Sequence, residues 1–196
     1  LEISSLFIYP IKSCGGISLA KSVVDKKGLE YDRRWLLVDD DGNFISQRKF
    51  PKMALIKTTL HNDGILASAE NMPGLIIRFD ETTGDNLKVK VWDDFLESQL
   101  VSCDANKWFS EFLDKNIRLV VMPEKVIRPL DPKYAKGPFT TAFSDGFPLL
   151  LIAEASLGDL NSRLENPVSM NRFRPNIVVS GAQPFEEDEW KTIRAG

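Results

Sequence analysis

Two arginines stand directly before an apolar run, where their charge must be balanced. Arg33 and Arg34 precede Trp35-Leu36-Leu37-Val38, and the alternation of a strand places them on opposite faces of that run. Both faces are apolar, so both arginines are expected at the mouth of a packed strand, where burying a charge alone costs several kcal/mol. A neighbouring carboxylate such as Asp32 could balance Arg33, and so could the anionic group of a ligand. The residues by themselves leave both partners open.

A third arginine stands before another apolar run. Arg174 lies in Asn171-Arg172-Phe173-Arg174-Pro175-Asn176, directly before a predicted strand over 177–180. Proline favours an extended backbone in the residue before it, so we expect Arg174 to be extended and to project from a constrained loop. A guanidinium fixed in this way suits bidentate recognition of a phosphate or a carboxylate. A salt bridge to Glu154 or Asp159 is the alternative.

Two loops carry further groups that could meet an anion. In Tyr9-Pro10-Ile11-Lys12-Ser13-Cys14-Gly15-Gly16, Lys12 and Ser13 offer a charge and a hydrogen bond, and the glycines let backbone N–H groups approach a ligand. The spacing matches neither a P-loop nor a dinucleotide fingerprint. In Phe143-Ser144-Asp145-Gly146-Phe147-Pro148, an Asp-Gly turn precedes an apolar run. Each loop could also be an ordinary turn.

Scarce residue types exclude several kinds of site. The 196 residues include one histidine, His61, and two cysteines, Cys14 and Cys103, so zinc sites with four cysteines or several histidines are excluded. The net charge of −3 offers no general attraction for nucleic acid or an anionic membrane. Two thiols suit a reducing compartment, and we expect a cytoplasmic location. We also expect His61 in a solvated turn and Cys103 in the core.

Apolar alternation and turn residues predict a mainly antiparallel β-structure. The expected strands are residues 4–9, 35–38 with 44–47, 55–60 with 65–68, and 75–79 with 87–92. Helices are predicted from a cap at Asp104 to about residue 116 and from a capping box at Ser156 to residue 164. The proline-rich stretch 122–139 indicates a connection, and the acidic run 186–189 a solvated face. No apolar run approaches the roughly 20 residues of a membrane-spanning helix, and no signal peptide is visible in a chain that starts at Leu1.

Six segments in this order resemble the MOSC-domain proteins, and among them the amidoxime-reducing components and bacterial reductases of N-hydroxylated compounds. The segments are Tyr9-Pro10-Ile11-Lys12-Ser13-Cys14, Asp32-Arg33-Arg34-Trp35-Leu36-Leu37-Val38, Ser144-Asp145-Gly146-Phe147-Pro148, Glu154-Ala155-Ser156-Leu157, Leu160-Asn161-Ser162-Arg163-Leu164 and Phe173-Arg174-Pro175-Asn176-Ile177-Val178. The resemblance implies an α+β fold that is predominantly antiparallel β. It implies an N-terminal β-barrel domain over 1–120 and the first part of a MOSC β-barrel domain with short helices over 121–196.

The resemblance also implies a molybdenum cofactor, Mo-molybdopterin. By family analogy it is contacted by Lys12, Ser13, Arg33, Asp145, Gly146, Phe147 and Arg174. In this family a cysteine beyond the region 186–190 holds the metal, and the 196 residues end before such a position. We therefore expect this fragment to bind the cofactor weakly or not at all, and we assign no metal ligand and no catalytic residue. The family also carries a label of pyridoxal phosphate binding.

The chemistry implied for the intact protein is two-electron reduction of N-hydroxylated compounds, such as amidoximes and hydroxylaminopurines. The substrate would be a small molecule, the electrons would come from a flavin, haem or iron–sulfur partner or domain, and no nucleic-acid polymer is expected as a partner. Membrane association is not visible in this chain, and an anchor upstream of Leu1 stays open. Two alternatives stay open. One is sulfur transfer of the cofactor-sulfurase type, with a persulfide on Cys14. The other is a non-catalytic module that carries the cofactor.

Overall fold

The computed structural model describes residues 1–194, which form two compact units interleaved along the chain. Unit 1 comprises Leu1–Phe7, Ser18–Val23 and the segment that starts at Leu149, and unit 2 comprises Ile8–Ile17 and Val24–Pro148. Most strand pairs within the described residues are antiparallel, and two α-helices accompany them, so the predicted α+β class is confirmed. The division into domains at residue 120 stays a prediction. No helix among the described residues is both long enough and apolar enough to cross a bilayer.

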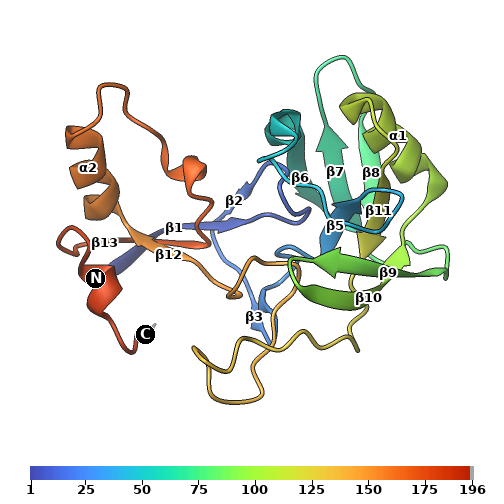
Figure 1. The fold of residues 1–196 in the computed structure, drawn as a ribbon. Helices are drawn as coiled ribbons and strands as arrows, with labels where there is room; N and C mark the ends of the chain where they lie inside the picture. The colour runs from blue at the N-terminus through green and yellow to red at the C-terminus, as the bar shows by residue number, and fades with distance from the viewer. Residues whose placement is uncertain (195–196) are drawn as a thin grey trace. The chain divides into compact units, whose positions relative to one another are not determined.

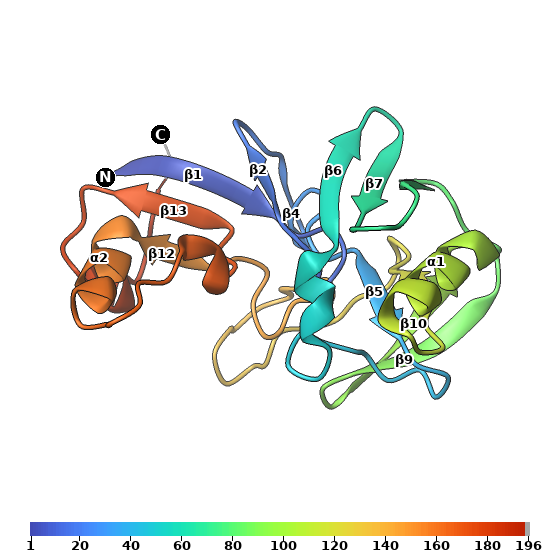
Figure 2. The ribbon, with the colours of Figure 1, turned by 90° about the horizontal axis from the view of Figure 1, so that it is seen from above.

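Unit 1 is built on one mixed four-stranded sheet (Figure 1). Its strand order is β12 (Leu151–Ala153), β13 (Ile177–Ser180), β1 (Glu2–Ile8) and β2 (Ile17–Leu19). The N-terminal strand β1 pairs antiparallel with β13, whereas β12 and β13 are parallel. Parallel neighbours need a crossover, and helix α2 (Glu154–Ser162) begins this connection and packs on β12 and β13 (Figure 2).

The start of α2 corrects two predictions. Ser156 does not cap the helix, because α2 begins at Glu154 and its N-cap residue Ala153 has no capping side chain. Instead, the Glu187 carboxylate accepts the Ala153 N–H at 2.9 Å and the Ser156 hydroxyl at 2.7 Å. Burial opposes ionisation of Glu187, but these hydrogen bonds hold its pKa below the usual value. One member of the acidic run therefore anchors the helix terminus rather than lying on a solvated face.

Unit 2 contains three antiparallel sheets. The four-stranded sheet has the order β5 (Trp35–Val38), β11 (Arg118–Val121), β10 (Asp94–Leu100) and β9 (Asn86–Val91). The three-stranded sheet is a meander of β6 (Lys57–His61), β7 (Gly64–Ser68) and β8 (Leu75–Arg78), and β3 (Val24–Asp25) pairs with β4 (Gly28–Leu29). A 3₁₀ turn over Pro51–Leu55 leads into β6.

Only one of the three predicted hairpins forms as expected. Strands β6 and β7 pair around an exposed turn at Asn62 and Asp63, as predicted, and His61 is exposed but is the last residue of β6 and not part of the turn. The third prediction is wrong, because β8 pairs with β7 and β9 pairs with β10, in a different sheet. Trp92, with φ of 57°, makes the β9–β10 turn in a conformation that glycine or asparagine usually adopts. The usual turn residues are therefore missing, and the sequence does not predict this turn. The first prediction is also wrong in part, since Phe44 forms only an isolated bridge to Val38.

Strand β5 is buried on both faces, as its sequence predicts. Trp35 and Leu37 pack in one apolar cluster, which also contains the apolar face of α1 (Cys103–Leu113). Leu36 and Val38 pack in a second cluster on the other face. Because β5 is packed on both faces, its position is fixed. The backbone of Arg33 and Arg34, which directly precede it, is therefore held in place as well.

Helix α1 forms close to where it is predicted, but its first residues differ from expectation. The cap is Ser102, whose hydroxyl accepts the Ala105 N–H at 3.3 Å, and Asp104 lies in the first turn. Cys103 is exposed, which corrects its expected place in the core. The predicted apolar stripe is buried, and α1 lies against β11 and β8.

Candidate functional site

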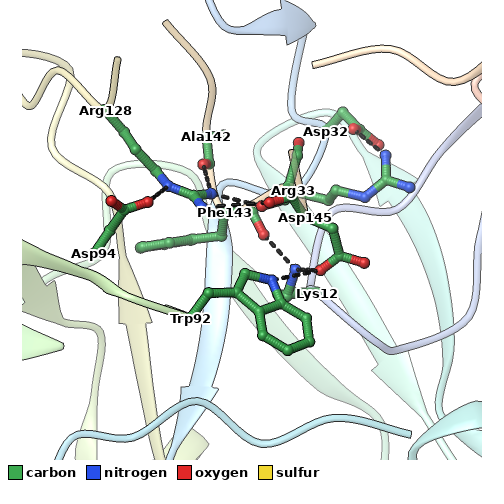
Figure 3. A network of polar contacts seen from close by, with 10 residues as sticks. Lys12, Asp32, Arg33, Trp92, Asp94, Arg128, Ala142, Phe143 and Asp145 are labelled. Atoms are coloured by element: carbon green, nitrogen blue, oxygen red, sulfur yellow. Dashed lines mark hydrogen bonds and ion pairs between the residues drawn. The ribbon is translucent and has the colours of Figure 1, made fainter. Parts of the chain in front are cut away.

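The site in unit 2 is organised around a buried ammonium group. Lys12 follows the end of β1, and its backbone N–H donates to the Trp35 carbonyl of β5 at 2.9 Å. Only 5% of the lysine is exposed. Its Nζ donates to the Phe143 carbonyl at 2.7 Å and to Oδ1 of Asp145 at 2.6 Å (Figure 3). Two of the predicted contact residues, Lys12 and Asp145, are thus brought together although they lie 133 positions apart in sequence.

Several charges act on Lys12 at once. Burial lowers its pKa from 10.5 to about 8, Asp145 opposes this shift, and the nearby guanidinium groups of Arg33 and Arg128 add to it. Burial also opposes ionisation of Asp145, but Lys12 and the Trp92 indole N–H, at 3.1 Å, hold the pKa of that carboxyl below its usual value. The cluster therefore combines three cations, and each is paired with a carboxylate: Lys12 with Asp145, Arg33 with Asp32 and Arg128 with Asp94.

Arg128 fixes the loop that supplies Asp145. It is 4% exposed and its Nε donates to Oδ2 of Asp94 at 2.7 Å. Its remaining nitrogens donate to the carbonyls of Ala142 at 3.1 Å, Ser144 at 2.5 Å and Asp145 at 3.4 Å (Figure 3). One guanidinium thus satisfies the backbone of a whole turn and sets its position.

Arg33 is held by the carboxylate considered as its alternative partner. Its φ is 51°, and its guanidinium donates to Asp32, whose side chain is only 1% exposed (Figure 3). Asp32 also accepts the Tyr9 N–H at 2.7 Å, and the guanidinium lies 4.9 Å from the centre of the Tyr9 ring. The Arg33 carbonyl accepts the Phe143 N–H at 3.1 Å, which ties this turn to the Asp145 loop. Arg34 differs, because it forms a separate bidentate pair with Asp25.

The glycines of the first loop pack against protein and do not face a ligand, which corrects their predicted role. A Cβ on Gly15 would lie 2.7 Å from the Ile56 carbonyl, which already accepts the Gly15 N–H. A Cβ on Gly16 would lie 2.4 Å from the Tyr9 ring. Ser13, with φ of 69°, is half-buried, and its carbonyl accepts the Gln47 amide at 2.8 Å.

The Asp145 loop opens onto a cavity of about 540 Å³, which we call the aromatic cavity. It is lined by Trp92, Asp93, Asp94, Arg128, Pro129, Leu130, Asp131, Pro132, Tyr134, Thr141, Asp145, Gly146 and Phe147. Nothing lies within 4 Å of where a Cβ on Gly146 would be, and Phe147 is half exposed. Both predicted contact residues are therefore open to a ligand.

Arg174 belongs to unit 1, and its backbone differs from the prediction. Its φ is 58°, in the left-handed region and not extended. A 3₁₀ turn over Met170–Arg172 closes with the Phe173 N–H on the Met170 carbonyl, and Asn176 then bonds to Leu150 and Phe7. The chain must reverse between these two sets of hydrogen bonds, and a left-handed residue makes the reversal despite Pro175.

The molybdenum cofactor implied by the resemblance can be tested against these residues. The hydroxyls of Thr141 and Ser144 are buried without a hydrogen-bond partner among the described residues. They belong to the same loop segment that binds Lys12 and Arg128, so polar donors and cations gather where an anionic, hydrogen-bonding group would fit. No group of three histidine, cysteine or acidic residues within 1–194 could hold a metal ion. The residues thus fit the anionic organic part of the cofactor.

Sequence reasoning missed Arg128 and Trp92. The signal for Arg128 was present, because it stands directly before Pro129 as Arg174 stands before Pro175. The proline-rich stretch around it was instead interpreted as a connection. Trp92 carried no comparable signal, since its role follows from the turn between β9 and β10.

Comparisons with known proteins give a consistent result. The family described as MOSC N-terminal beta barrel domain matches residues 1–116, and the family described as MOSC domain matches residues 138–196. Mitochondrial amidoxime-reducing component 1 of Mus musculus is 38% identical over 99% of this chain and 60% of its own length. Mitochondrial amidoxime reducing component 2 is 33% identical in Bos taurus and 32% in Homo sapiens, over 99% of this chain and 60% and 61% of those proteins. A solution structure of a Bordetella bronchiseptica protein covers 62% of this chain and 96% of that one, at 16% identity and with a TM-score of 0.42, too low to indicate a shared fold.

Two facts follow from these relatives. The chain spans about 60% of the length of the curated relatives that it matches. The predicted cytoplasmic location is wrong, because these relatives are named mitochondrial components.

Proposed function

Because this chain belongs to the family of proteins with a MOSC N-terminal β-barrel domain and a MOSC domain, we propose that it is part of a molybdenum-dependent reductase. The proposed substrates are small N-hydroxylated compounds, amidoximes among them, as the names of the relatives suggest. The observation that carries the proposal is the buried Lys12 ammonium, held by Asp145 and flanked by two guanidinium groups. Such a cluster is suited to an anionic cofactor.

The proposed roles follow from the contacts of each residue. Within the described residues, Lys12 uses two of its three N–H donors, so one remains for an oxyanion. Ser13, Arg33 and Arg174 would add donors, and Gly146 and Phe147 would offer backbone groups at the open edge of the loop. Each charge-assisted hydrogen bond to the cofactor would contribute roughly 1.5–3 kcal/mol. The bound cofactor would supply the two-electron chemistry, while these residues orient it.

The net reaction would add two electrons and two protons to the N–O bond, giving an N–H group and water. The electrons would come from a flavin, haem or iron–sulfur partner or domain. We place the protein in the mitochondrion, on the names of its relatives. Sulfur transfer through Cys14 is disfavoured, because Cys14 is fully buried in the apolar cluster beneath β5 and a persulfide there could not reach a substrate. Weak or absent cofactor binding by residues 1–196 alone stays a prediction.

The proposal is tested by expressing the full-length reading frame and measuring bound molybdenum by elemental analysis. Lys12→Met should lose most of the metal, whereas Lys107→Met, which removes an exposed lysine from α1, should retain it. Arg174→Ala is a second test at a partly exposed position, and circular dichroism checks that each variant is folded. A wild-type protein without molybdenum, or a folded Lys12→Met variant with a full complement, would contradict the proposal.

A further inference from the structure

A second cavity in unit 2, of about 360 Å³, lies on the face of β5 that carries the Trp35 side chain, and we call it the Trp35 cavity. Val121 of β11 pairs with Trp35, and Gln99 of β10 pairs with Val121. Residues directly opposite each other in a sheet share a face, so these three side chains form one wall, and all three line the cavity. The lining includes none of the residues that act on Lys12, so the proposed function does not account for this cavity.

A buried indole in this wall points to a ligand. Trp35 is 3% exposed, and its Nε1–H has no hydrogen-bond partner among the described residues. The indole of Trp108 in α1 differs, because its Nε1 donates to the Pro73 carbonyl at 2.6 Å. Buried donors in folded proteins are nearly always satisfied, and an indole N–H can only donate. A ligand in the Trp35 cavity that carries an acceptor oxygen would satisfy it.

The same wall offers a second polar group. The side-chain amide of Gln99 is half-buried, and within residues 1–194 it makes no hydrogen bond. An amide both donates and accepts, so Gln99 can bind a carbonyl oxygen or an N–H group of a ligand. Trp35 and Gln99 thus provide two points of attachment on one face of the sheet.

Aromatic rings supply the apolar part of the lining. The rings of Tyr31 and Phe79 stack with their centres 4.2 Å apart, and the centre of the Phe79 ring lies 6.2 Å from that of Trp35. No lysine or arginine in the described part of the chain lies over these three rings. The apolar surface that they present to the cavity is therefore available to an aliphatic group of a ligand.

The charges around the cavity favour a cation. Three of its five carboxylates already have a cationic partner, namely Asp25, Asp80 and Glu124. Glu30 and Glu81 form no ion pair with any residue that the structure describes. Glu81 accepts only a backbone N–H, which leaves its charge uncompensated. Two carboxylates without counter-ions at one opening attract a positively charged ligand.

We propose that the Trp35 cavity binds a small primary ammonium compound with a carbonyl oxygen near its charge, of the class of aliphatic amino acid amides. The carbonyl oxygen accepts the hydrogen bond of the Trp35 indole, the ammonium group is attracted by Glu30 and Glu81, and the aliphatic group packs on the ring of Phe79. A carboxylate in place of the amide is disfavoured, because the two glutamates repel it. This site goes beyond the proposed function and needs no cofactor.

The probe for this proposal is L-leucinamide at neutral pH, added to the isotopically labelled full-length protein. The NMR signal of the Trp35 indole N–H should move downfield and saturate, because a new hydrogen bond deshields the proton. The Trp108 indole is the internal control, and its signal should stay in place because this N–H is already bound.

Three compounds of similar size separate the groups of the ligand. Isopentylamine lacks the carbonyl and should leave the Trp35 signal unmoved. Isocaproamide lacks the ammonium group and should bind roughly three- to tenfold more weakly than leucinamide, the effect of two ion pairs exposed to water. Leucine itself, which carries a carboxylate, should bind more weakly than leucinamide. Equal binding of leucine and leucinamide would overturn the proposal.

Two variants and their controls test the lining. Gln99→Met should weaken leucinamide binding roughly three- to tenfold, the effect of one lost hydrogen bond. Glu30→Gln should weaken it roughly two- to fivefold, the effect of an exposed charge. Gln183→Met and Glu97→Gln change exposed residues outside the cavity and should bind as the wild type does.

Two results would contradict the proposal, and neither depends on the reductase. One is a Trp35 signal that stays unmoved up to the solubility limit of leucinamide, and the other is unchanged affinity in both Gln99→Met and Glu30→Gln. A protein that binds leucinamide but acquires no molybdenum would support the Trp35 cavity and contradict the proposed reductase alone. A protein that retains molybdenum but does not bind leucinamide would overturn the Trp35 cavity alone.

Discussion

Burial determines how much each ion pair of this protein matters. Asp32, with a side chain 1% exposed, binds Arg33 and the Tyr9 N–H, whereas Asp63 and Arg78 form a pair in which both side chains are more than half exposed. In water the second pair is screened and gains little. In the protein interior, removal of one partner leaves the other charge uncompensated. The same contact type therefore has very different energetic consequences at the two places.

The comparison of Asp32→Asn with Asp63→Asn measures this difference. We expect Asp32→Asn to lower the free energy of unfolding by about 3–5 kcal/mol, since it leaves the Arg33 charge uncompensated. Asp63→Asn should change it by no more than about 1 kcal/mol. Urea unfolding followed by circular dichroism gives both values. Similar losses in the two variants would contradict the assignment of Arg33 to Asp32.

The lowered pKa of Lys12 makes a prediction about pH. The folded pKa is about 8 and the unfolded value 10.5, so between these values the unfolded chain binds more protons at this residue. Stability contributed by this group therefore rises with pH from about 8 to 10.5, by about 3 kcal/mol in total.

The effect of Lys12 can be isolated by subtraction. The free energy of unfolding of the wild type minus that of Lys12→Met should rise over pH 8–10, while other lysines and tyrosines cancel. Lys107→Met, which removes an exposed lysine, should give a flat difference over the same range. A flat difference for Lys12→Met as well would show that the ammonium has an ordinary pKa.

At the scale of elements, the N-terminus of α2 depends on a residue from a distant turn. Glu187 replaces a local cap by accepting the Ala153 N–H and the Ser156 hydroxyl. We expect Glu187→Gln to destabilise unit 1 by about 1 kcal/mol, the usual value of a helix cap, and Glu189→Gln to have little effect. Hydrogen exchange of the α2 amides measures the loss.

The contact of Glu187 with the start of α2 also predicts that the stability of this helix depends on pH. Because the pKa of Glu187 is lowered in the folded protein, its contribution is present above the unfolded value of 4.5 and is lost as the pH falls below it. The difference in α2 protection between wild type and Glu187→Gln should therefore vanish at low pH. A difference that persists when the carboxyl is protonated would assign the effect to shape and not to charge.

Local patterns predicted the elements that local forces determine. Strand β5 was predicted from four consecutive apolar residues, α1 from its apolar stripe, and the β6–β7 hairpin from its turn residues. The pairing of β8 and β9 was not predictable in this way, because their partners are chosen by packing and by a turn at Trp92 that lacks the usual turn residues. The cap from Glu187 acts over 34 positions and has no local pattern at all.

In the candidate site too, the individual residues were predictable from local sequence, whereas the contacts between them were not. Lys12 and Asp145 could be named as ligand contacts because charged and turn residues stand beside apolar strands. Their pairing with each other joins positions 133 residues apart, and only the fold provides it. Gly15 and Gly16 show the opposite error, since a glycine pair suggests a ligand loop but here relieves contacts with Ile56 and Tyr9.

At the scale of the whole molecule, unit 1 combines strands from the first and the last parts of the chain. In unit 1 the central strand β13 has β1 on one side and β12 on the other. Val179→Pro removes a backbone donor and forces a fixed φ within this strand, where proline is not tolerated. We expect the amides of β1, β12 and α2 to lose protection from hydrogen exchange, while those of β10, β11 and α1 keep it. Val179→Ala, which retains the N–H, is the control and should leave the β13 pairing intact.

The same variant tests whether the Lys12 environment is a property of unit 2 by itself. All the groups that act on Lys12 by the contacts described, Asp145, Phe143, Arg33 and Arg128, belong to unit 2. The pKa of Lys12, followed by NMR of its side chain, should therefore stay at about 8 in folded unit 2 of Val179→Pro. If the pKa of Lys12 returned to 10.5 together with the loss of β13 protection, the environment of Lys12 would not be a property of unit 2 by itself.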